Sequence, residues 1–248
     1  MVGDGCSYGG RAGVDRSAGS RAPYLVFRNH HVGREGLPLH VLIIGASRGI
    51  GLETVKAALA AGHGVRAFSR SADALTLSHP KLEKHPGDAL NDGDVAAALE
   101  GVDAVIQALG VPASELRRPV SLFSSATRVL VPAMEQAGVR RLVAVTGFGA
   151  GDSRDAIPCP GRVPFRMLLG RAYDDKTEQE RLIRESTLDW TVIRPGILVP
   201  GPGCGRARVL VEPSTWRGGL ISRADVARVL VRELCEDPHI HAAPVVVW

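Results

Sequence analysis

Three glycines that follow an apolar run are the first residues whose spacing indicates chemistry. The run HVLII leads into GASRGIG, residues 45 to 51, and the chain then continues into the helical pattern LETVKAALAAG. Gly45 permits a tight turn, Gly49 lets the backbone approach a phosphate, and Gly51 allows close packing of helix on strand. Free N–H groups at the start of a helix attract anions. We therefore expect a dinucleotide pyrophosphate to bind Gly45, Ser47, Arg48, Gly49, Ile50 and Gly51; a glycine-rich turn without a ligand is the alternative.

Two arginines near this loop indicate which dinucleotide is bound. Many dinucleotide-binding proteins carry an acidic residue at the end of the second strand, where it receives the ribose hydroxyls. The corresponding run here, GVRAFSR, ends with Arg70, and the glycine loop itself contains Arg48. A pair of guanidinium groups suits a 2′-phosphate, which favours NADP(H) over NAD(H) as the cofactor. The alternative is that both are solvated surface residues of an arginine-rich chain.

Apolar runs alternate with helical segments along the part of the chain that must position these residues. We expect strands at 40–45, 64–69, 81–85, 103–109, 140–147, 189–195 and 243–248, and helices at 49–61, 92–100, 120–137, 166–186 and 223–236. Parallel strands covered on both faces read as continuous apolar runs, and VLIIG and LVAVTG do so. The sequence therefore predicts an α/β, Rossmann-type doubly wound parallel sheet in a single domain, with ligands beyond the carboxyl ends of the strands.

Residues 1–37 differ in composition from the rest of the chain. They are rich in Gly, Ser and Arg and show no sustained periodicity, so we expect a disordered N-terminal extension followed by one domain from 38 to 248. The formal net charge is +4, and residues 1–37 contribute five arginines against three acidic residues. This distribution argues against a surface that binds nucleic acid.

Composition also limits the compartment and the partners. No run approaches the ~20 apolar residues that a membrane helix needs. The four cysteines, Cys6, Cys159, Cys204 and Cys235, form no CxxC pair, so no zinc or dithiol motif is visible. We expect a cytoplasmic protein with reduced thiols, no metal, no membrane or nucleic-acid partner, a small-molecule substrate, and a monomeric or homodimeric state.

Several longer stretches carry a resemblance to a known family. They are GASRGIG, GDALNDGDVAAAL, DAVIQALG, DDKTEQERLIRESTLDWTVIRPGIL and ISRADVARVL. With them, the chain from residue 40 to 248 resembles the atypical short-chain dehydrogenase/reductases, a group of NAD(P)-binding proteins that includes biliverdin-IXβ reductase-like, flavin reductase-like and NmrA-like members. The resemblance covers nearly the whole expected domain, but members of this group differ widely in activity.

The resemblance implies further cofactor-binding residues. Asp88 would receive the adenine amino group, and Ala89 would line the adenine pocket. Residues Ala108, Leu109 and Gly110 would pass under the adenosine ribose, and Pro195 and Ile197 would flank the nicotinamide. The alternative for Asp88 is a helix cap or a turn former.

The resemblance also directs attention to a tyrosine and a lysine. Catalytically typical short-chain reductases use a YxxxK pattern, in which the phenol transfers a proton and the ammonium lowers the phenol pKa and holds the ribose. This chain has Tyr173 and Lys176 in a YxxK, so the expected tyrosine position is filled by Ala172. A shift of one residue turns a side chain by about 100° around the helix, so the phenol need not point at the nicotinamide. The alternative for Lys176 is an exposed i, i+4 pair with Glu180.

We take Lys176, Tyr173 and Thr146 as the candidate catalytic residues. Thr146 and Ser153 lie after the fifth strand, where the family often places a hydroxyl residue, although Thr146 also suits a strand. Loops near 148–170 and 197–220 are expected to form the substrate walls. Arginines there could meet an acidic substrate, with solvated loop charges as the alternative; they are Arg162, Arg166, Arg206 and Arg208.

Three functions fit these observations. The first is an NADPH-dependent oxidoreductase that transfers hydride to a small, planar acceptor such as a flavin, quinone or carbonyl compound, with the proton taken from water if no tyrosine supplies it. The second is a non-catalytic NADP(H)-binding redox sensor of the NmrA-like kind. The third is an enzyme similar to sugar-nucleotide epimerases, for which the short region after RPG leaves little room for a second substrate domain.

Overall fold

A mostly parallel sheet organises the structure. The computed structural model describes residues 38–112, 120–236 and 239–248, and within them eight strands form one sheet in the order β3-β2-β1-β4-β5-β6-β10-β8. The strands are β1 (His40–Ile44), β2 (Gly64–Ser69), β3 (Leu82–Pro86), β4 (Ala104–Gln107), β5 (Arg141–Val145), β6 (Asp189–Pro195), β8 (Arg208–Leu210) and β10 (Val245–Val247). The expected Rossmann-type α/β domain is confirmed.

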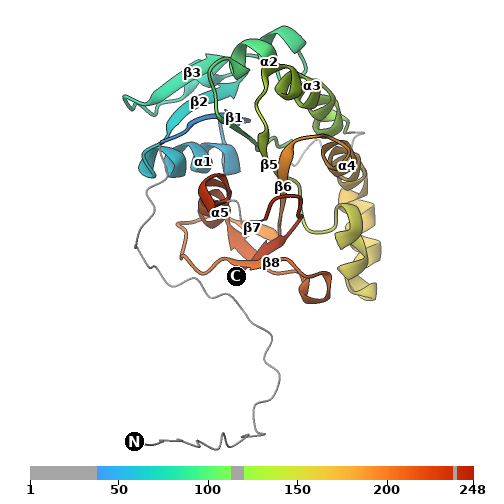
Figure 1. Cartoon of the computed structure of the whole chain (residues 1–248). Helices are drawn as coiled ribbons and strands as arrows, with labels where there is room; N and C mark the ends of the chain where they lie inside the picture. The colour runs from blue at the N-terminus through green and yellow to red at the C-terminus, as the bar shows by residue number, and fades with distance from the viewer. Residues whose placement is uncertain (1–37, 113–119, 237–238) are drawn as a thin grey trace, which may run out of the picture.

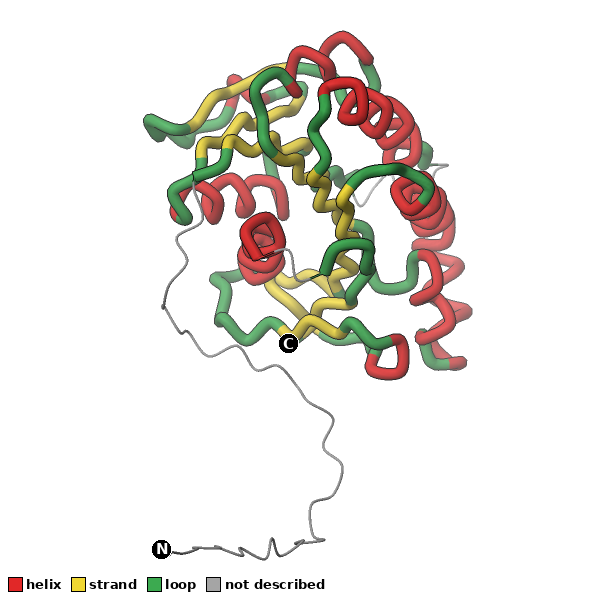
Figure 2. Tube along the Cα trace, in the orientation of Figure 1, coloured by secondary structure: helices red, strands yellow, loops and turns green. Residues whose placement is uncertain are grey.

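Helices cover both faces of this sheet (Figure 1). On one face lie α1 (Gly49–Ala60) and α5 (Arg223–Glu236), and on the other lie α2 (Asp92–Leu99), α3 (Leu122–Ala137) and α4 (Cys159–Arg184). Figure 2 shows the strands as a central layer between these two sets of helices. Each face of the sheet has its own buried apolar cluster, because side chains alternate between the two faces of every strand.

The crevice for a ligand follows from the strand order. β1 pairs with β2 on one side and with β4 on the other, with Ile44 opposite Phe68 and opposite Gln107. The chain therefore reverses its direction of winding at β1, and the loops that follow β1 and β4 diverge there. In such sheets the crevice beyond the carboxyl ends of the strands is the usual ligand site.

Two segments that were expected to be loops contain regular structure. In the segment 148–170, a 3₁₀ helix spans Gly151–Ala156 and α4 begins at Cys159, seven residues before the expected start at 166. The prolines near 158–160 read as loop residues in the sequence, but a proline in the first turn of a helix costs no hydrogen bond. The segment 197–220 holds β7 (Ile197–Val199), β8 and a 3₁₀ helix at Pro213–Thr215, and it leads into β9 (Leu220–Ser222).

The sheet also differs from a wholly parallel one. β8 pairs with β10 in the antiparallel direction, and β7 and β9 form a separate two-stranded parallel sheet. β7, β8 and β9 have only three residues each, so they give no periodic signal that a sequence could reveal, whereas β10 falls within the strand expected at 243–248. The expected disorder of residues 1–37 lies outside the described residues. Among the residues that are described, no helix is both long and apolar enough to cross a membrane.

Gly51 fixes how closely α1 approaches the sheet. A Cβ atom at this position would lie 2.1 Å from the carbonyl oxygen of Gly45 and 3.2 Å from the Cα atom of Ala46. Both atoms belong to the backbone, so neither can move without shifting the loop. The close packing of helix on strand that the sequence predicted for Gly51 is therefore present.

We expect Gly51→Ala to lower the free energy of unfolding by about 1–3 kcal/mol, the usual cost of overpacking a filled site. Gly218→Ala is the control, because a Cβ there would meet only Phe148, at an ordinary 3.6 Å. Urea denaturation of the cofactor-free variants measures both effects. Equal stabilities of the two variants would contradict the assignment of Gly51.

Candidate cofactor and substrate site

One cavity of about 1410 Å³ lies beyond the carboxyl ends of the central strands. Nearly all the residues that the sequence singled out line it together: Gly45, Ser47, Arg48, Gly49, Ile50, Arg70, Asp88, Ala89, Ala108, Leu109, Gly110, Thr146, Tyr173, Lys176, Pro195 and Ile197. Gly51 does not line the cavity, because it packs against the loop from below, and Ser153, Arg206 and Arg208 do not line it either. Residues that lie more than 150 positions apart in the chain, such as Gly45 and Ile197, thus surround one space whose volume suffices for a dinucleotide and an acceptor.

The glycine loop is shaped to let an anion approach the backbone. Gly45 has φ +87°, and a Cβ there would lie 2.7 Å from the carbonyl oxygen of Ala108, so only glycine fits. Gly49 has φ +61°, and no atom lies within 4 Å of its Cβ position, so its backbone faces open space. Arg48 precedes α1 without a side-chain hydrogen bond to the helix. The first N–H groups of α1 therefore remain available to a phosphate.

Asp88 follows β3, which lies on the other side of the central strands from β6 and its last residue, Pro195. The Oδ1 of Asp88 accepts a hydrogen bond of 3.0 Å from the N–H of Leu90, so the carboxylate forms a turn. The cap of α2 is a different residue, Asn91, whose Oδ1 accepts from the N–H of Asp94 at 3.0 Å. Asp88 is therefore a turn former, as one alternative from the sequence proposed, and it is not the helix cap of the other. Its side chain also lines the cavity.

The loop between β1 and α1 and the end of β2 supply several polar groups to this cavity. Arg48 and Arg70 are exposed and line the cavity, and neither has an ion-pair or hydrogen-bond partner among the described residues. The Oγ of Ser69 is buried and lacks a partner within that same part of the chain. A buried hydroxyl without a partner is costly, and a ligand oxygen at this point would satisfy it. These groups fit the ribose and 2′-phosphate of NADP(H).

Lys176 projects from α4 towards the end of β5. Its Nζ donates to the carbonyl oxygen of Thr146 and lies 5.0 Å from the ring centre of Phe123 and 5.3 Å from that of Tyr173. Burial lowers the pKa of Lys176 to about 8, against the opposing effect of the carboxylates of Glu180 and Asp175.

The interpretation of Lys176 as an exposed partner of Glu180 is wrong, because Glu180 is buried and binds Arg194 instead.

The phenol of Tyr173 reaches the cavity despite its offset position. A Cβ at Gly147 would lie 2.6 Å from the Tyr173 oxygen, so the phenol occupies the space over the end of β5 that a side chain at 147 would fill. Burial raises the pKa of Tyr173, which keeps the phenol neutral and able to donate a proton. Ala172 lines the cavity as well. The offset therefore does not turn the phenol away from the site.

The hydroxyl of Thr146 is engaged in the protein interior. It donates to Oε1 of Glu180 at 2.7 Å, while the Thr146 carbonyl oxygen holds Lys176. Ser153 is buried, does not line the cavity, and bonds to the backbone of Gly149 and Ala150. The hydroxyl residues expected after β5 thus stabilise this region, and Thr146 contributes to the site through its backbone.

Several lining residues were not found by sequence reasoning. Phe148, Ile157, Leu169 and Gly218 add apolar surface, and Arg223 adds a charge. The first four lie in the segments 148–170 and 197–220 that were expected to form the substrate walls, and Arg223 lies in the stretch ISRADVARVL, but no pattern marked any of the five individually. Arg206 and Arg208 do not line the cavity, and the side chains of Arg162 and Arg166 lie outside the described ones.

The pKa of Lys176 predicts a pH dependence of stability. An unfolded lysine has a pKa of 10.5, and the folded value is about 8. Between these values the unfolded chain binds a proton that the folded chain does not, so the free energy of unfolding gains an increment as pH rises. The difference in free energy of unfolding between the wild-type protein and Lys176→Met should stay constant below pH 8. It should rise in favour of the wild-type protein from pH 8 to 10.5. A difference that stays flat across this range would show that the ammonium is not desolvated.

Comparisons with known proteins identify the family to which the chain is similar. A family model described as NAD(P)H-binding matches residues 45–237. An uncharacterized chloroplastic protein of Arabidopsis thaliana is 31% identical over 205 residues, which are 79% of this chain and 72% of that protein. The structure of ChuY, titled an anaerobilin reductase from Escherichia coli O157:H7, is 29% identical with a TM-score of 0.69, covering 84% of this chain and 96% of that one.

A further solved structure shows the fold alone. A short-chain dehydrogenase/reductase from Veillonella parvula, solved in complex with NADP, has a TM-score of 0.72 at 17% identity. The match covers 85% of this chain and 94% of that chain. The arrangement of sheet and helices described above is therefore one that accommodates a nicotinamide dinucleotide in that protein.

Proposed function

Because the chain belongs to the NAD(P)H-binding family, whose relatives include oxidoreductases, we propose that it is an NADPH-dependent oxidoreductase that reduces a small, planar acceptor. One observation carries the proposal: a single cavity is lined both by Arg48 before α1 and Arg70 after β2, and by Tyr173 and Lys176 of α4. A bound cofactor would supply the hydride. The chain's own residues would bind and orient the two reactants.

The polar groups near the end of β5 support proton transfer. Tyr173 is held neutral by burial, and its oxygen lies beside Gly147, next to the wall formed by Pro195 and Ile197. We assign to Tyr173 the donation of the proton that a reduced carbonyl or imine-type acceptor requires. Lys176 lies against the Tyr173 ring, where its ammonium stabilises negative charge on the phenol after transfer.

The apolar side of the cavity supports a planar acceptor. Ile197 is 69% exposed although it is a large apolar residue, and it lines the cavity together with Phe148 and Gly218. A flat ring system packs well against such a surface, which offers apolar contact with little polar competition. ChuY is titled a reductase of anaerobilin, which agrees with a reductase role for this chain.

The experiment that tests this function is a cofactor titration followed by a screen of acceptors. NADPH fluorescence reports binding, and NADPH oxidation with flavins, quinones, carbonyl compounds and linear tetrapyrroles reports turnover. Oxidation with one of these acceptors supports the proposal. Binding without turnover across the screen would favour the redox sensor instead.

The cofactor wall predicts a preference for NADPH over NADH. One charge-assisted contact to the 2′-phosphate contributes on the order of 1.5–3 kcal/mol, which is about tenfold or more in affinity. Arg70→Ala should therefore remove most of the difference between the two Kd values and leave the Kd of NADH unchanged. Isothermal titration calorimetry measures all four values, and equal affinities in the wild-type protein would contradict the NADP(H) assignment.

The position of Tyr173 predicts its importance for turnover. Tyr173→Phe removes the proton but keeps the ring, so it should lower kcat by roughly 10²-fold or more and leave the Kd of NADPH unchanged. Single-turnover kinetics with the best acceptor of the screen measures the effect. A loss below tenfold would indicate that water supplies the proton, as the offset in the sequence suggested.

A further inference from the structure

Arg223 is a charged residue of the cavity that none of the sequence motifs assigns to a ligand. It is the first residue of α5 and is half-buried, and it lines the same cavity as the glycine loop. Within the described part of the chain its guanidinium has no hydrogen-bond or ion-pair partner. By contrast, Arg228 of the same helix pairs with Asp225 at 3.0 Å.

Such unpaired arginines gather at the cavity. Most described arginines take part in a hydrogen bond, an ion pair or another contact of their side chain, and the five that do not are Arg48, Arg70, Arg206, Arg217 and Arg223. Three of these line the cavity: Arg48, Arg70 and Arg223. Arg48 and Arg70 face the nucleotide end, which leaves Arg223 as a separate cation from another part of the fold.

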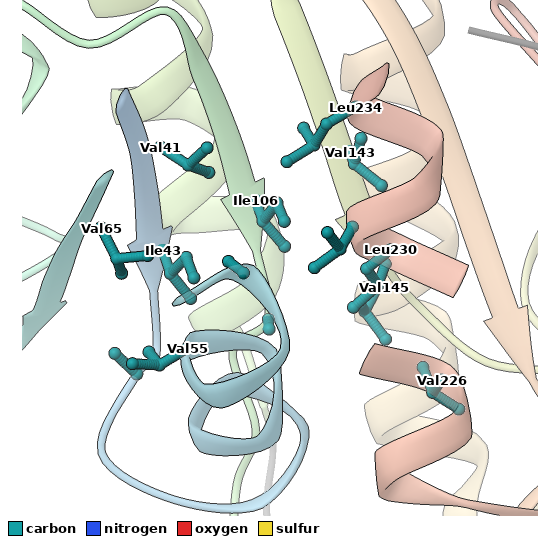
Figure 3. Close-up of a cluster of buried hydrophobic side chains, with 14 of the residues drawn as sticks. Val41, Ile43, Val55, Val65, Ile106, Val143, Val145, Val226, Leu230 and Leu234 are labelled. Carbon is teal, nitrogen blue, oxygen red and sulfur yellow. The ribbon is translucent and has the colours of Figure 1, made fainter. Parts of the chain in front are cut away.

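The placement of α5 beside α1 brings Arg223 to the carboxyl edge of the sheet, where it lines the cavity. Figure 3 shows Val226 and Leu230 of α5 facing Val145 of β5, with α1 beside them. Arg223 precedes Val226 by three residues, so it lies on the same helix face one turn nearer the carboxyl edge of the sheet. β9 pairs with β7 so that Ser222 lies opposite Val199, which brings Arg223 beside the cavity residues at 200 and 201.

The start of α5 is held rigidly, so the Arg223 backbone has a fixed position. The buried carboxylate of Asp225 accepts from the N–H groups of Cys204 and Gly205, each at 2.9 Å, and from the indole of Trp248 at 2.9 Å. The hydroxyl of Ser222 also donates to it at 3.0 Å. These bonds hold the pKa of Asp225 at about 2. A cation that starts from a fixed backbone loses less freedom on binding an anion.

The ligand group that fits this position is a pyrophosphate. The N-terminus of α1 supplies N–H donors and roughly half a positive charge from one side, which does not neutralise the two negative charges of a pyrophosphate. Glu53 of α1 also lines the cavity, but its carboxylate is paired with Lys56 at 2.8 Å, so it does not serve as the partner of Arg223. A guanidinium can bind two phosphate oxygens at once. We infer that Arg223 binds the cofactor pyrophosphate from the α5 side, opposite the glycine loop.

This inference rests on the proposed function, since it requires a bound dinucleotide, and three ligands test it. NADPH and 2′-phospho-ADP-ribose carry the pyrophosphate, whereas 2′-AMP carries only the adenosine and the 2′-phosphate. Arg223→Met should raise the Kd of NADPH and of 2′-phospho-ADP-ribose by about ten- to hundredfold and leave the Kd of 2′-AMP unchanged, as measured by calorimetry. Arg223→Lys should restore part of the loss. Arg217→Met is the matched control, because Arg217 is exposed, unpaired among the described residues and outside the cavity.

Each other outcome has a defined meaning. Unchanged affinity for NADPH in Arg223→Met would overturn the inference, and a raised KM for the acceptor in that variant would assign Arg223 to the acceptor instead. An equal rise in the Kd of 2′-AMP would overturn it too, because the loss of affinity would then not depend on the presence of a pyrophosphate in the ligand. If the wild-type protein binds none of the three ligands, the proposed function fails and the inference fails with it.

Discussion

The buried ion pair between Arg194 and Glu180 holds the two sides of the site together. Arg194 is fully buried on β6, and its Nε donates to Oε1 of Glu180 at 3.0 Å. Its Nη2 binds both Oε2 of Glu180 and the carboxylate of Asp152. Removing one partner would leave a buried charge uncompensated, which costs several kcal/mol. The packing of α4 against β5 and β6 is therefore fixed at this point.

The consequences of this pair extend to the catalytic candidates. Glu180 lies one helical turn after Lys176, and it also accepts from the hydroxyl of Thr146, so α4 is held in the register that places Lys176 on the Thr146 carbonyl. The guanidinium of Arg194 lies 5.0 Å from the ring centre of Trp216, in the segment that follows β8. The same residue thus connects the segment after β8, which leads to the cavity residue Gly218, to the helix that carries Lys176.

Sequence reasoning succeeded where local geometry decides the structure. The glycine loop was predictable because Gly45 and Gly51 each meet a backbone atom that excludes any Cβ, and the parallel strands were predictable because both of their faces are buried. The burial of Arg194 depends on Glu180, and the place of Arg223 beside the cavity depends on the pairing of β9 with β7. In both cases the contacting segments lie more than 10 residues apart in the chain, so no local pattern encodes the contact. The start of α4 was missed because its prolines are read as loop residues although a first helical turn accepts them.

Two small residues make room for the phenol of Tyr173 at the end of β5. They are Gly147, which follows this strand, and Ala172, which fills the position where the resemblance led us to expect the tyrosine. A side chain at 147 would collide with the Tyr173 oxygen at 2.6 Å, so glycine there is what admits a phenol from the neighbouring helix position. Ala172 is small enough to leave the cavity open beside it. The phenol of Tyr173 can therefore reach the end of β5 from an offset helix position, because the residues at 147 and 172 are both small.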